Sequence, residues 1–520
     1  MAHLTALTTL SLLSATQAFP YNPGSASQHR TIEWHPCPDV EAELHAALPG
    51  VEFPHPFDCA SLLVPLDYTD PGSAPLNLSL IRVNATKTPV LGSVLWNPGG
   101  PGGTGYENLA VQSDDLITTL GGQYNIISWD PRGTGRTIPF DCELSETGLQ
   151  RRDAAALVSN NLTEYFLDSG WNDAQLYADA CYQAQNETGR FLGTAFVARD
   201  MVEIIDALGE DGLLRYWGLS YGTLLGSTFA SMFPERVARV LLDGNINPHD
   251  YQVGHWGNYL VDADKTLLAF LEECAKNKDR CALAQYTGQS TALDLLNIVN
   301  AALEPLGQNA TTGPEAWSIY ATLKQTIYSG LYFPRRWPVL AETITALLNG
   351  SSTDAVSSTN ASATPVPYNL GVDSINGIRC SDTLWEAASA EDILDQVKYQ
   401  GTVSQSFSDA GYFFTWVCAA WKLRAKEQYT GDFSAKTKFP ILFVNGPFDV
   451  ATPLVSAHNA SAGFEGSVVL QHAGYGHGLT AHRSRCTDET VQAYFREGVL
   501  PEVGTICKPD VEAWDLQNQS

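Results

Sequence analysis

Basic residues are scarce in this 520-residue chain, which holds 30 Lys and Arg against 57 Asp and Glu and has a formal net charge of −27 at pH 7. Proteins that bind nucleic acids or anionic membranes use clustered positive charge, so this balance argues against both kinds of partner. An acidic protein also suits acidic or neutral surroundings, where partial protonation relieves self-repulsion. A soluble extracellular protein without any pH adaptation explains the same balance equally well.

Long hydrophobic runs are absent after the N-terminus, where no segment approaches the roughly 18 consecutive apolar residues of a membrane-spanning helix. Residues 1–18 carry no Asp, Glu, Lys or Arg, contain the apolar stretch 4–13 and end in Thr16-Gln17-Ala18. Small residues at these last positions fit a signal-peptidase site, whereas the stretch is too short and too rich in Thr and Ser for an anchor. We therefore expect a signal peptide at 1–18 and a secreted protein, although the usual positive charge at the start is missing.

Metal-site spacings are also missing. The ten cysteines include no C-x-x-C pair of the kind found in zinc and redox sites, and we expect neither a metal nor a cofactor. An even number of cysteines behind a signal peptide favours disulfides, but the sequence alone leaves their connectivity open. The cysteines are Cys37, Cys59, Cys142, Cys181, Cys274, Cys281, Cys380, Cys418, Cys486 and Cys507.

A G-x-S-x-G pentapeptide is present at residues 218–222, between an apolar run at 213–217 and a helix-like stretch at 223–233. This setting predicts a sharp strand-to-helix turn, in which small neighbours let strand and helix approach closely and the serine backbone is strained. The turn would expose the Ser220 hydroxyl above the sheet and place the Tyr221 N–H beside a developing oxyanion. Ser220 is therefore a candidate nucleophile.

A catalytic serine needs a histidine to take its proton and a carboxylate to orient that histidine, in the chain order Ser, Asp, His for this type of turn. Asp449 follows a predicted buried strand at 439–444, and His477 stands between glycines after a predicted strand at 467–471. A histidine that acts as base must be neutral, so we expect kcat/KM to fall on the acid side with an apparent pKa near or below that of free imidazole, about 6.5. Two weaker candidates lie nearby, His472 and His482.

Residues 96–105 hold five glycines and follow an apolar run at 90–95. A segment so rich in glycine is predicted to be a loop. We expect one of its backbone N–H groups, that of Gly100, to join the Tyr221 N–H in stabilising a tetrahedral intermediate. A phosphate cradle is the alternative, but the segment lacks both the G-K-[ST] ending and the G-x-G-x-x-G pattern, so nucleotide binding is not expected.

In combination these motifs resemble the α/β-hydrolase family of prolyl and tripeptidyl aminopeptidases. The sequence most resembles the secreted tripeptidyl branch, because Asn97 and Pro98 precede Gly-Gly-Pro-Gly where prolyl aminopeptidases carry His-Gly-Gly-Pro-Gly. The resemblance covers roughly residues 37–507. Its further motifs are D-P-R-G-T-G at 130–135, W-G-x-S-Y-G-T at 217–223, L-D-G at 242–244, I-R-C-x-D at 378–382 and C-x-x-W at 418–421.

The resemblance implies a secreted serine exopeptidase that releases tripeptides, or N-terminal proline, from free peptide N-termini. An esterase or other acyl hydrolase that acts on a metabolite stays open, because one scaffold hosts both activities. A catalytically inactive binding protein is a third alternative, which the complete set of Ser, Asp and His disfavours. Peptides or small acyl compounds are thus the expected partners, and the protein is expected to be a monomer.

Disulfide pairing is implied by the same resemblance, since similar proteins join neighbouring cysteines. This gives Cys37–Cys59, Cys142–Cys181, Cys274–Cys281, Cys380–Cys418 and Cys486–Cys507. N-x-[ST] sequons mark expected surface positions if the source glycosylates its secreted proteins. They begin at Asn77, Asn84, Asn161, Asn186, Asn309, Asn349, Asn360, Asn459 and Asn518.

Alternating strand and helix patterns predict an α/β-hydrolase fold, with a doubly wound, mostly parallel sheet and a large, mainly helical inserted cap. We expect the core at 19–245 and 436–520 and the cap at 246–435, where residues 350–367 are expected to form a surface loop rich in Ser, Thr and Ala. An aminopeptidase must hold a substrate ammonium group with cap carboxylates. The candidates are Asp250, Asp262, Asp264, Glu272 and Glu273.

Overall fold

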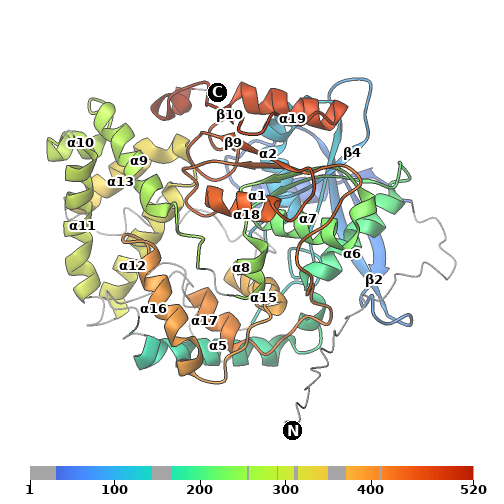
Figure 1. Ribbon diagram of the computed structural model, residues 1–520, viewed down its shortest axis with the longest axis horizontal. Coiled ribbons are helices and arrows are strands. Elements are labelled where there is room, and N and C mark those ends of the chain that lie inside the picture. The colour runs from blue at the N-terminus through green and yellow to red at the C-terminus, as the bar shows by residue number, and fades with distance from the viewer. Residues whose placement is uncertain are drawn as a thin grey trace, which may run out of the picture.

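The computed structural model describes residues 31–142, 163, 166–254, 257–289, 291–309, 314–349, 371–408 and 413–518. The predicted signal peptide, the surface loop at 350–367 and the sequons at Asn161 and Asn360 lie outside these residues. The described chain forms one sheet beside a thick layer of helices (Figure 1).

The sheet has ten strands in the order β1-β2-β3-β5-β4-β6-β7-β8-β9-β10 within the described residues. The pairs from β1 to β5 along this order are antiparallel, and all pairs from β5 to β10 are parallel. The predicted mostly parallel sheet is therefore confirmed. The strands are β1 (His35–Pro36), β2 (Phe57–Pro65), β3 (Pro75–Val83), β4 (Ser93–Asn97), β5 (Asn125–Trp129), β6 (Leu214–Leu219), β7 (Val237–Asp243), β8 (Leu442–Asn445), β9 (Val468–His472) and β10 (Ile506–Cys507).

Helices cover both faces of the sheet, which explains why every residue of β4 and β8 is buried. On one face, α6 (Thr194–Ala207) and α7 (Tyr221–Met232) share an apolar core with the strands. On the other face, α2 (Gly105–Leu120) and α19 (Arg485–Glu497) do the same. Two further helices belong to the sheet domain, α1 (Pro38–Ala47) and α18 (Leu454–Ser461).

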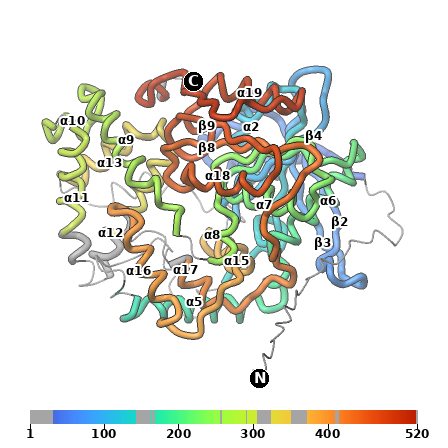
Figure 2. Tube along the Cα trace, in the orientation of Figure 1, coloured from blue at the N-terminus to red at the C-terminus, as the bar shows by residue number. Residues whose placement is uncertain are grey.

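The part of the chain that connects β7 to β8 forms most of a helical layer, and this layer has its own apolar core. The chain leaves the sheet for this layer and returns from α16 and α17 to β8 and β9, as Figure 2 shows. None of the helices in the described part of the chain has the length and apolar character needed to cross a membrane. The helices of the layer are α8 (Pro248–Gln252), α9 (Ala263–Lys276), α10 (Ala282–Thr287), α11 (Ala292–Asn309), α12 (Pro314–Gly330), α13 (Trp337–Leu348), α15 (Val372–Asp382), α16 (Leu394–Val403) and α17 (Phe413–Ala420).

Segments outside the predicted cap also join this layer. The helix α5 (Trp171–Gln185) precedes β6 in the chain and contacts α17. At the C-terminus, the ring of Trp514 lies 6.2 Å from that of Phe270 on α9. The cap boundaries at 246 and 435 stay a prediction, since helical-layer contacts come from both sides of them. Short helical turns complete the fold: η1 (Phe166–Gly170), η2 (Gly189–Phe191), η3 (Pro234–Arg236), η5 (Pro334–Arg336), η6 (Ala390–Ile393) and η7 (Ala513–Asn518).

Five disulfides join neighbouring cysteines in the pattern that the resemblance implies. Cys380–Cys418 ties α15 to α17 within the helical layer, and Cys142–Cys181 ties α5 to the segment after β5. Cross-links of this kind are typical of proteins that fold in an oxidising compartment.

The D-P-R-G-T-G segment after β5 has a structural role. Arg132 is fully buried and holds Asp200 through contacts of 2.8 and 2.9 Å from two guanidinium nitrogens. Asp130, also buried, accepts the N–H of Gly105 at 2.9 Å. Because Gly105 is the first residue of α2, this bond fixes the end of the glycine-rich loop beside the elbow.

Candidate active site

Ser220 occupies the turn between β6 and α7, as the G-x-S-x-G motif predicts. Its backbone lies in the left-handed region, at φ 58° and ψ −120°, which strains a residue other than glycine. Its N–H donates to the carbonyl of Asp243 at 2.9 Å. Gly222 must lack a side chain here, because a Cβ on it would lie 2.8 Å from the Asn97 carbonyl oxygen. Tyr221 begins α7, so its N–H is at a helix N-terminus.

His477 and Asp449 form a buried pair at the carboxyl edge of the sheet. The Nδ1–H of His477 lies 2.9 Å from both carboxylate oxygens of Asp449. Asp449 is held in turn by the N–H groups of Ala451 and Thr452, each 2.9 Å from Oδ1, and by the Thr452 hydroxyl, 2.7 Å from Oδ2. These bonds satisfy the carboxylate in one orientation and keep it facing the imidazole.

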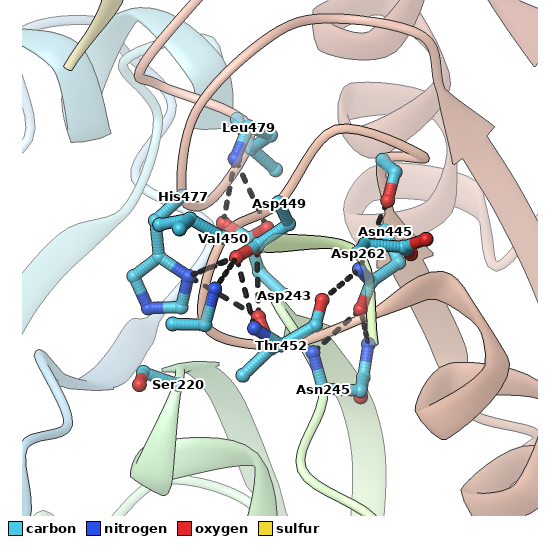
Figure 3. Close-up of polar contacts among 12 residues, drawn as sticks. Ser220, Asp243, Asn245, Asp262, Asn445, Asp449, Val450, Thr452, His477 and Leu479 are labelled. Carbon is cyan, nitrogen blue, oxygen red and sulfur yellow. Dashed lines mark hydrogen bonds and ion pairs between the residues drawn. The ribbon is translucent and has the colours of Figure 1, made fainter. Parts of the chain in front are cut away.

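The other edge of the His477 ring faces Ser220. Figure 3 shows the imidazole between Asp449 and Ser220, with the second ring nitrogen on the serine side. The structure thus brings together the three residues that the sequence predicts as a triad. Ser220 comes from the turn after β6, Asp449 from the turn after β8 and His477 from the loop after β9.

The pKa of His477 is raised above its ordinary value. Burial works to lower it, but the negative charge and hydrogen bond of Asp449 outweigh burial, and the charge of Asp243 adds to them. The upward shift argues against an apparent pKa below that of free imidazole, so the acid limb of the rate profile is expected above about 6.5 instead. On acidification, the His477 ring therefore takes up its proton at a higher pH than free imidazole does.

Asp243 is a second buried carboxylate of this site, which the sequence indicated only as part of the L-D-G motif. Its two oxygens accept the N–H of Leu479 at 3.0 and 3.2 Å, and Oδ2 accepts the Trp217 Nε1–H at 3.3 Å. Burial raises the pKa of Asp243 to about 7, against the opposing charge of His477. The residue therefore ties the histidine loop to β6, the strand that leads into the elbow.

The next residue, Gly244, leaves room for Asp449 and His477. A Cβ on Gly244 would lie 3.1 Å from the Thr452 hydroxyl oxygen and 3.2 Å from His477 Cε1. Its φ of +64° is also a conformation that favours glycine. The backbone conformation thus favours glycine in the L-D-G motif, and a side chain here would push on Thr452 and His477.

The glycine-rich loop packs directly on the elbow. A Cβ on Gly99 would lie 2.8 Å from Ser220 Cβ, and the Gly99 N–H donates to the Asn97 side chain at 3.0 Å. Because the Gly99 N–H is used in this way, the following amide, that of Gly100, stays the candidate for the second oxyanion donor. The side chain of Asn97, the first residue of the N-P-G-G-P-G motif, thus fixes the backbone at the start of the loop.

The helical layer reaches His477 through Tyr332, which no sequence motif marked. Its carbonyl accepts the His477 N–H at 3.0 Å, and its ring lies 5.1 Å from the imidazole. Tyr332 lies in the turn after α12, so the inserted helices fix the position of the histidine as well as cover it.

The cap acids predicted to bind a substrate ammonium group have other contacts. Asp264 accepts three hydrogen bonds from the loop at 404–406, and buried Glu273 meets Lys276 at 2.6 Å and the Tyr475 hydroxyl at 3.2 Å. Of the other three, Asp250 and Asp262 accept backbone N–H groups and Glu272 is exposed.

The two weaker histidine candidates support the structure. His472 is buried, with Nδ1 2.9 Å from the Thr487 hydroxyl oxygen, and burial lowers its pKa to about 4. His482 donates from Nε2 to the Val511 carbonyl at 2.8 Å. Both therefore hold the C-terminal segment against the sheet.

Comparison with known proteins agrees with this geometry. Residues 92–321 match the family model described as the alpha/beta hydrolase fold, and residues 405–507 match that of TAP-like proteins. The chain has the α/β-hydrolase fold. The predicted fold class is thus confirmed, and the three candidate residues take the strand-end positions at which such a fold carries its chemistry.

Curated relatives of this α/β-hydrolase span most of its length. It is 25% identical over 476 residues to tripeptidyl aminopeptidase of Streptomyces lividans, which covers 88% of the chain and 84% of that protein. It is 26% identical over 489 residues to serine protease Hip1 of Mycobacterium tuberculosis, covering 92% and 91%. Carboxylesterase B of the same species is 28% identical over 469 residues, covering 87% and 86%.

Proposed function

We propose that the protein is a secreted serine exopeptidase that removes tripeptides from free peptide N-termini. In this proposal Ser220 is the nucleophile, His477 the general base and Asp449 the acid that orients it, while the N–H groups of Tyr221 and Gly100 form the oxyanion hole. The observation that carries the proposal is the buried Asp449–His477 pair, whose free ring edge faces a strained serine.

The reaction proceeds in two acyl transfers. The Ser220 oxygen attacks the scissile carbonyl carbon as its proton passes to His477 Nε2, and the two backbone amides stabilise the resulting oxyanion. His477 then gives the proton to the leaving amine, which departs and leaves an ester on Ser220. Water then attacks the ester carbonyl with His477 as its base, and the bond to Ser220 breaks to release the carboxylic acid product.

The peptide substrate is supported by the relatives, two of which are named as peptidases, and by the Asn97-Pro98 form of the glycine loop. Release of single N-terminal proline is the second choice. Ester hydrolysis is a separate candidate, because carboxylesterase B is similar over most of the same length. Acyl transfer at Ser220 can cleave either a peptide or an ester. The helical cap, which shapes the substrate site, therefore decides which of the two the protein hydrolyses.

Two rates separate these candidates: that of a chromogenic tripeptide with a free amino group and that of its N-acetylated twin. We expect efficient turnover of the free amine and a rate at least about tenfold lower for the acetylated twin, because a site built for an ammonium group is left unpaired by the amide. Equal rates on the two peptides would show that no free amino group is recognised and would contradict an exopeptidase, whereas rapid hydrolysis of a simple ester beside inert peptides would favour the esterase. Ser220→Ala is the matched control in both assays.

Secretion, glycosylation and a monomeric state are part of the same proposal. The five disulfides support an oxidising compartment. Several sequons have exposed asparagines: Asn77, Asn84, Asn186, Asn349 and Asn459. Mass spectrometry of the exported protein before and after enzymatic deglycosylation tests the signal-peptide cleavage after Ala18 and the glycans together, and gel filtration tests the monomer.

A further inference from the structure

The side chain of Tyr221, the residue after Ser220, is held by a chain of hydrogen bonds. Its phenol oxygen lies 2.5 Å from the Thr194 hydroxyl oxygen, which in turn lies 2.5 Å from Oδ2 of Asp382. An ionised carboxylate only accepts hydrogen bonds, so the single hydroxyl proton of Thr194 goes to Asp382 and the phenol donates to Thr194. The chain therefore runs in one direction, from Tyr221 through Thr194 to Asp382.

The protonation states at the two ends fit this direction. Burial raises the pKa of Asp382 to about 6, so the carboxylate is mostly charged at pH 7. Burial also raises the pKa of Tyr221 well above its ordinary value, so the phenol keeps the proton that it donates. Thr194 and Tyr221 are both buried. If one member of the chain were removed, its neighbour would be left with an unsatisfied polar group.

Asp382 also caps the helix that carries Thr194. Thr194 is the first residue of α6, and its N–H donates to Oδ1 of Asp382 at 2.7 Å. The first N–H groups of a helix have no partner within it, and a negative charge is favourable at that end. Gly193, at the N-cap position, has no side chain that could serve instead. One carboxylate thus fixes both the N–H and the hydroxyl of Thr194.

The chain links the turn at Ser220 to the helical layer, because Asp382 is the last residue of α15. The same helix reaches the glycine-rich loop at its other end. A Cβ on Gly102 would lie 2.9 Å from Cβ of Ser374, which is in the first turn of α15. Gly102 follows two residues after Gly100, the other candidate oxyanion donor. The helix is therefore linked to both segments that carry a candidate donor.

We propose that Asp382 is a positioning residue of the oxyanion hole, which acts through Thr194 to fix the direction of the Tyr221 N–H. A phenol held at its far end restrains the backbone of the residue that carries this N–H. The inference rests on the proposed function, but only on Ser220 as nucleophile and the Tyr221 N–H as oxyanion donor, so it applies to peptide and ester substrates alike. A misdirected donor weakens binding of the transition state and leaves binding of the substrate unchanged.

The test is steady-state hydrolysis of p-nitrophenyl acetate and of the free-amine chromogenic tripeptide by three variants. Thr194→Val replaces the hydroxyl with a methyl group, and Tyr221→Phe removes the phenol oxygen. Asp382→Asn turns an NH₂ toward Thr194 while its oxygen still accepts the helix N–H, so the phenol loses its acceptor. Each variant should lower kcat about ten- to a hundredfold and keep KM within about threefold of wild type. Thr194→Ser keeps the hydroxyl and should restore most of kcat.

A double variant separates positioning from a general structural role. Tyr221→Phe combined with Asp382→Asn should lower kcat no further than the slower single variant, because both changes break one chain. The matched control is Thr119→Val. Thr119 is also buried and donates its hydroxyl to Asp488 at 2.9 Å, but between α2 and α19, and its loss should leave kcat within about twofold of wild type.

Two results would overturn the inference: a Thr194→Val or Tyr221→Phe enzyme, folded by its melting profile, with kcat within about threefold of wild type, or losses that multiply in the double variant. These two single variants decide the question even if Asp382→Asn does not fold. A Ser220→Ala protein as active as wild type on both substrates would instead refute the proposed function. Activity on the ester alone would refute only the choice of peptide, and the variants would then be compared on the ester.

Discussion

Replacing Asp449 with asparagine tests the proposed triad through its hydrogen bonds. The N–H groups of Ala451 and Thr452 both donate to Oδ1, each at 2.9 Å. An introduced amide must therefore place its oxygen at that position and its NH₂ where Oδ2 was, facing Nδ1 of His477. The imidazole must then accept a hydrogen bond at Nδ1 and carry its proton on Nε2, the nitrogen that faces Ser220.

A histidine in this tautomer is unable to take the Ser220 proton. We expect Asp449→Asn to lower kcat by about 10⁴, the order known for triads with a reversed tautomer. At about 1.36 kcal/mol for each factor of ten, this is roughly 5.4 kcal/mol of lost transition-state stabilisation. Folding should change little, because the amide keeps the two backbone bonds.

The assay is steady-state hydrolysis of the free-amine chromogenic peptide, with a melting profile for each variant. Asp115→Asn is the matched control, since Asp115 also holds a basic partner, Arg483 at 2.8 Å, but lies on the α2 side of the sheet. An Asp449→Asn enzyme within tenfold of wild type would refute the argument and require another acid for His477.

Three other predictions concern the groups around this pair. The raised pKa of His477 means that its ring is protonated at a higher pH than free imidazole, so kcat/KM should fall with an apparent pKa above about 6.5. Asp243, whose pKa of about 7 leaves it part of its negative charge in this range, favours the protonated ring, so Asp243→Asn should shift this limb to lower pH. An acid limb at the same pH in Asp243→Asn and wild type would show that the charge of Asp243 does not act on His477. Gly244→Ala should lower kcat by about ten- to a hundredfold, because its Cβ displaces the base; a normal rate would show that the loop has room. Joint replacement of Cys380 and Cys418 by alanine should cost about 2–4 kcal/mol in unfolding free energy, and an unchanged melting temperature would show that α15 and α17 hold without the cross-link.

Sequence alone predicted the parts of the site that depend on local backbone chemistry. The elbow around Ser220 needs small residues at fixed spacing, and Asp449 and His477 follow strands in a fixed order, so each leaves a pattern in the chain. The parallel sheet was predictable for the same reason, since its buried strands are short apolar runs between helices. The predicted strand at 439–444 differs from β8 by only a few residues.

Contacts between distant segments left no such pattern. Tyr332 covers His477 from a turn more than a hundred residues earlier in the chain, and Asp243 contacts the histidine loop across the sheet. The five cap acids could not be ranked from the sequence for a similar reason, because contacts such as those of Asp264 and Glu273 with neighbouring loops and side chains form only when the helices assemble.

The most direct test of the central claim is mass spectrometry of the products that the wild-type enzyme forms from an unblocked decapeptide. The account predicts a ladder in which the peptide shortens by three residues at a time from its N-terminus, and no products with Ser220→Ala. Cuts within the chain, or an intact decapeptide beside rapid hydrolysis of simple esters, would contradict it.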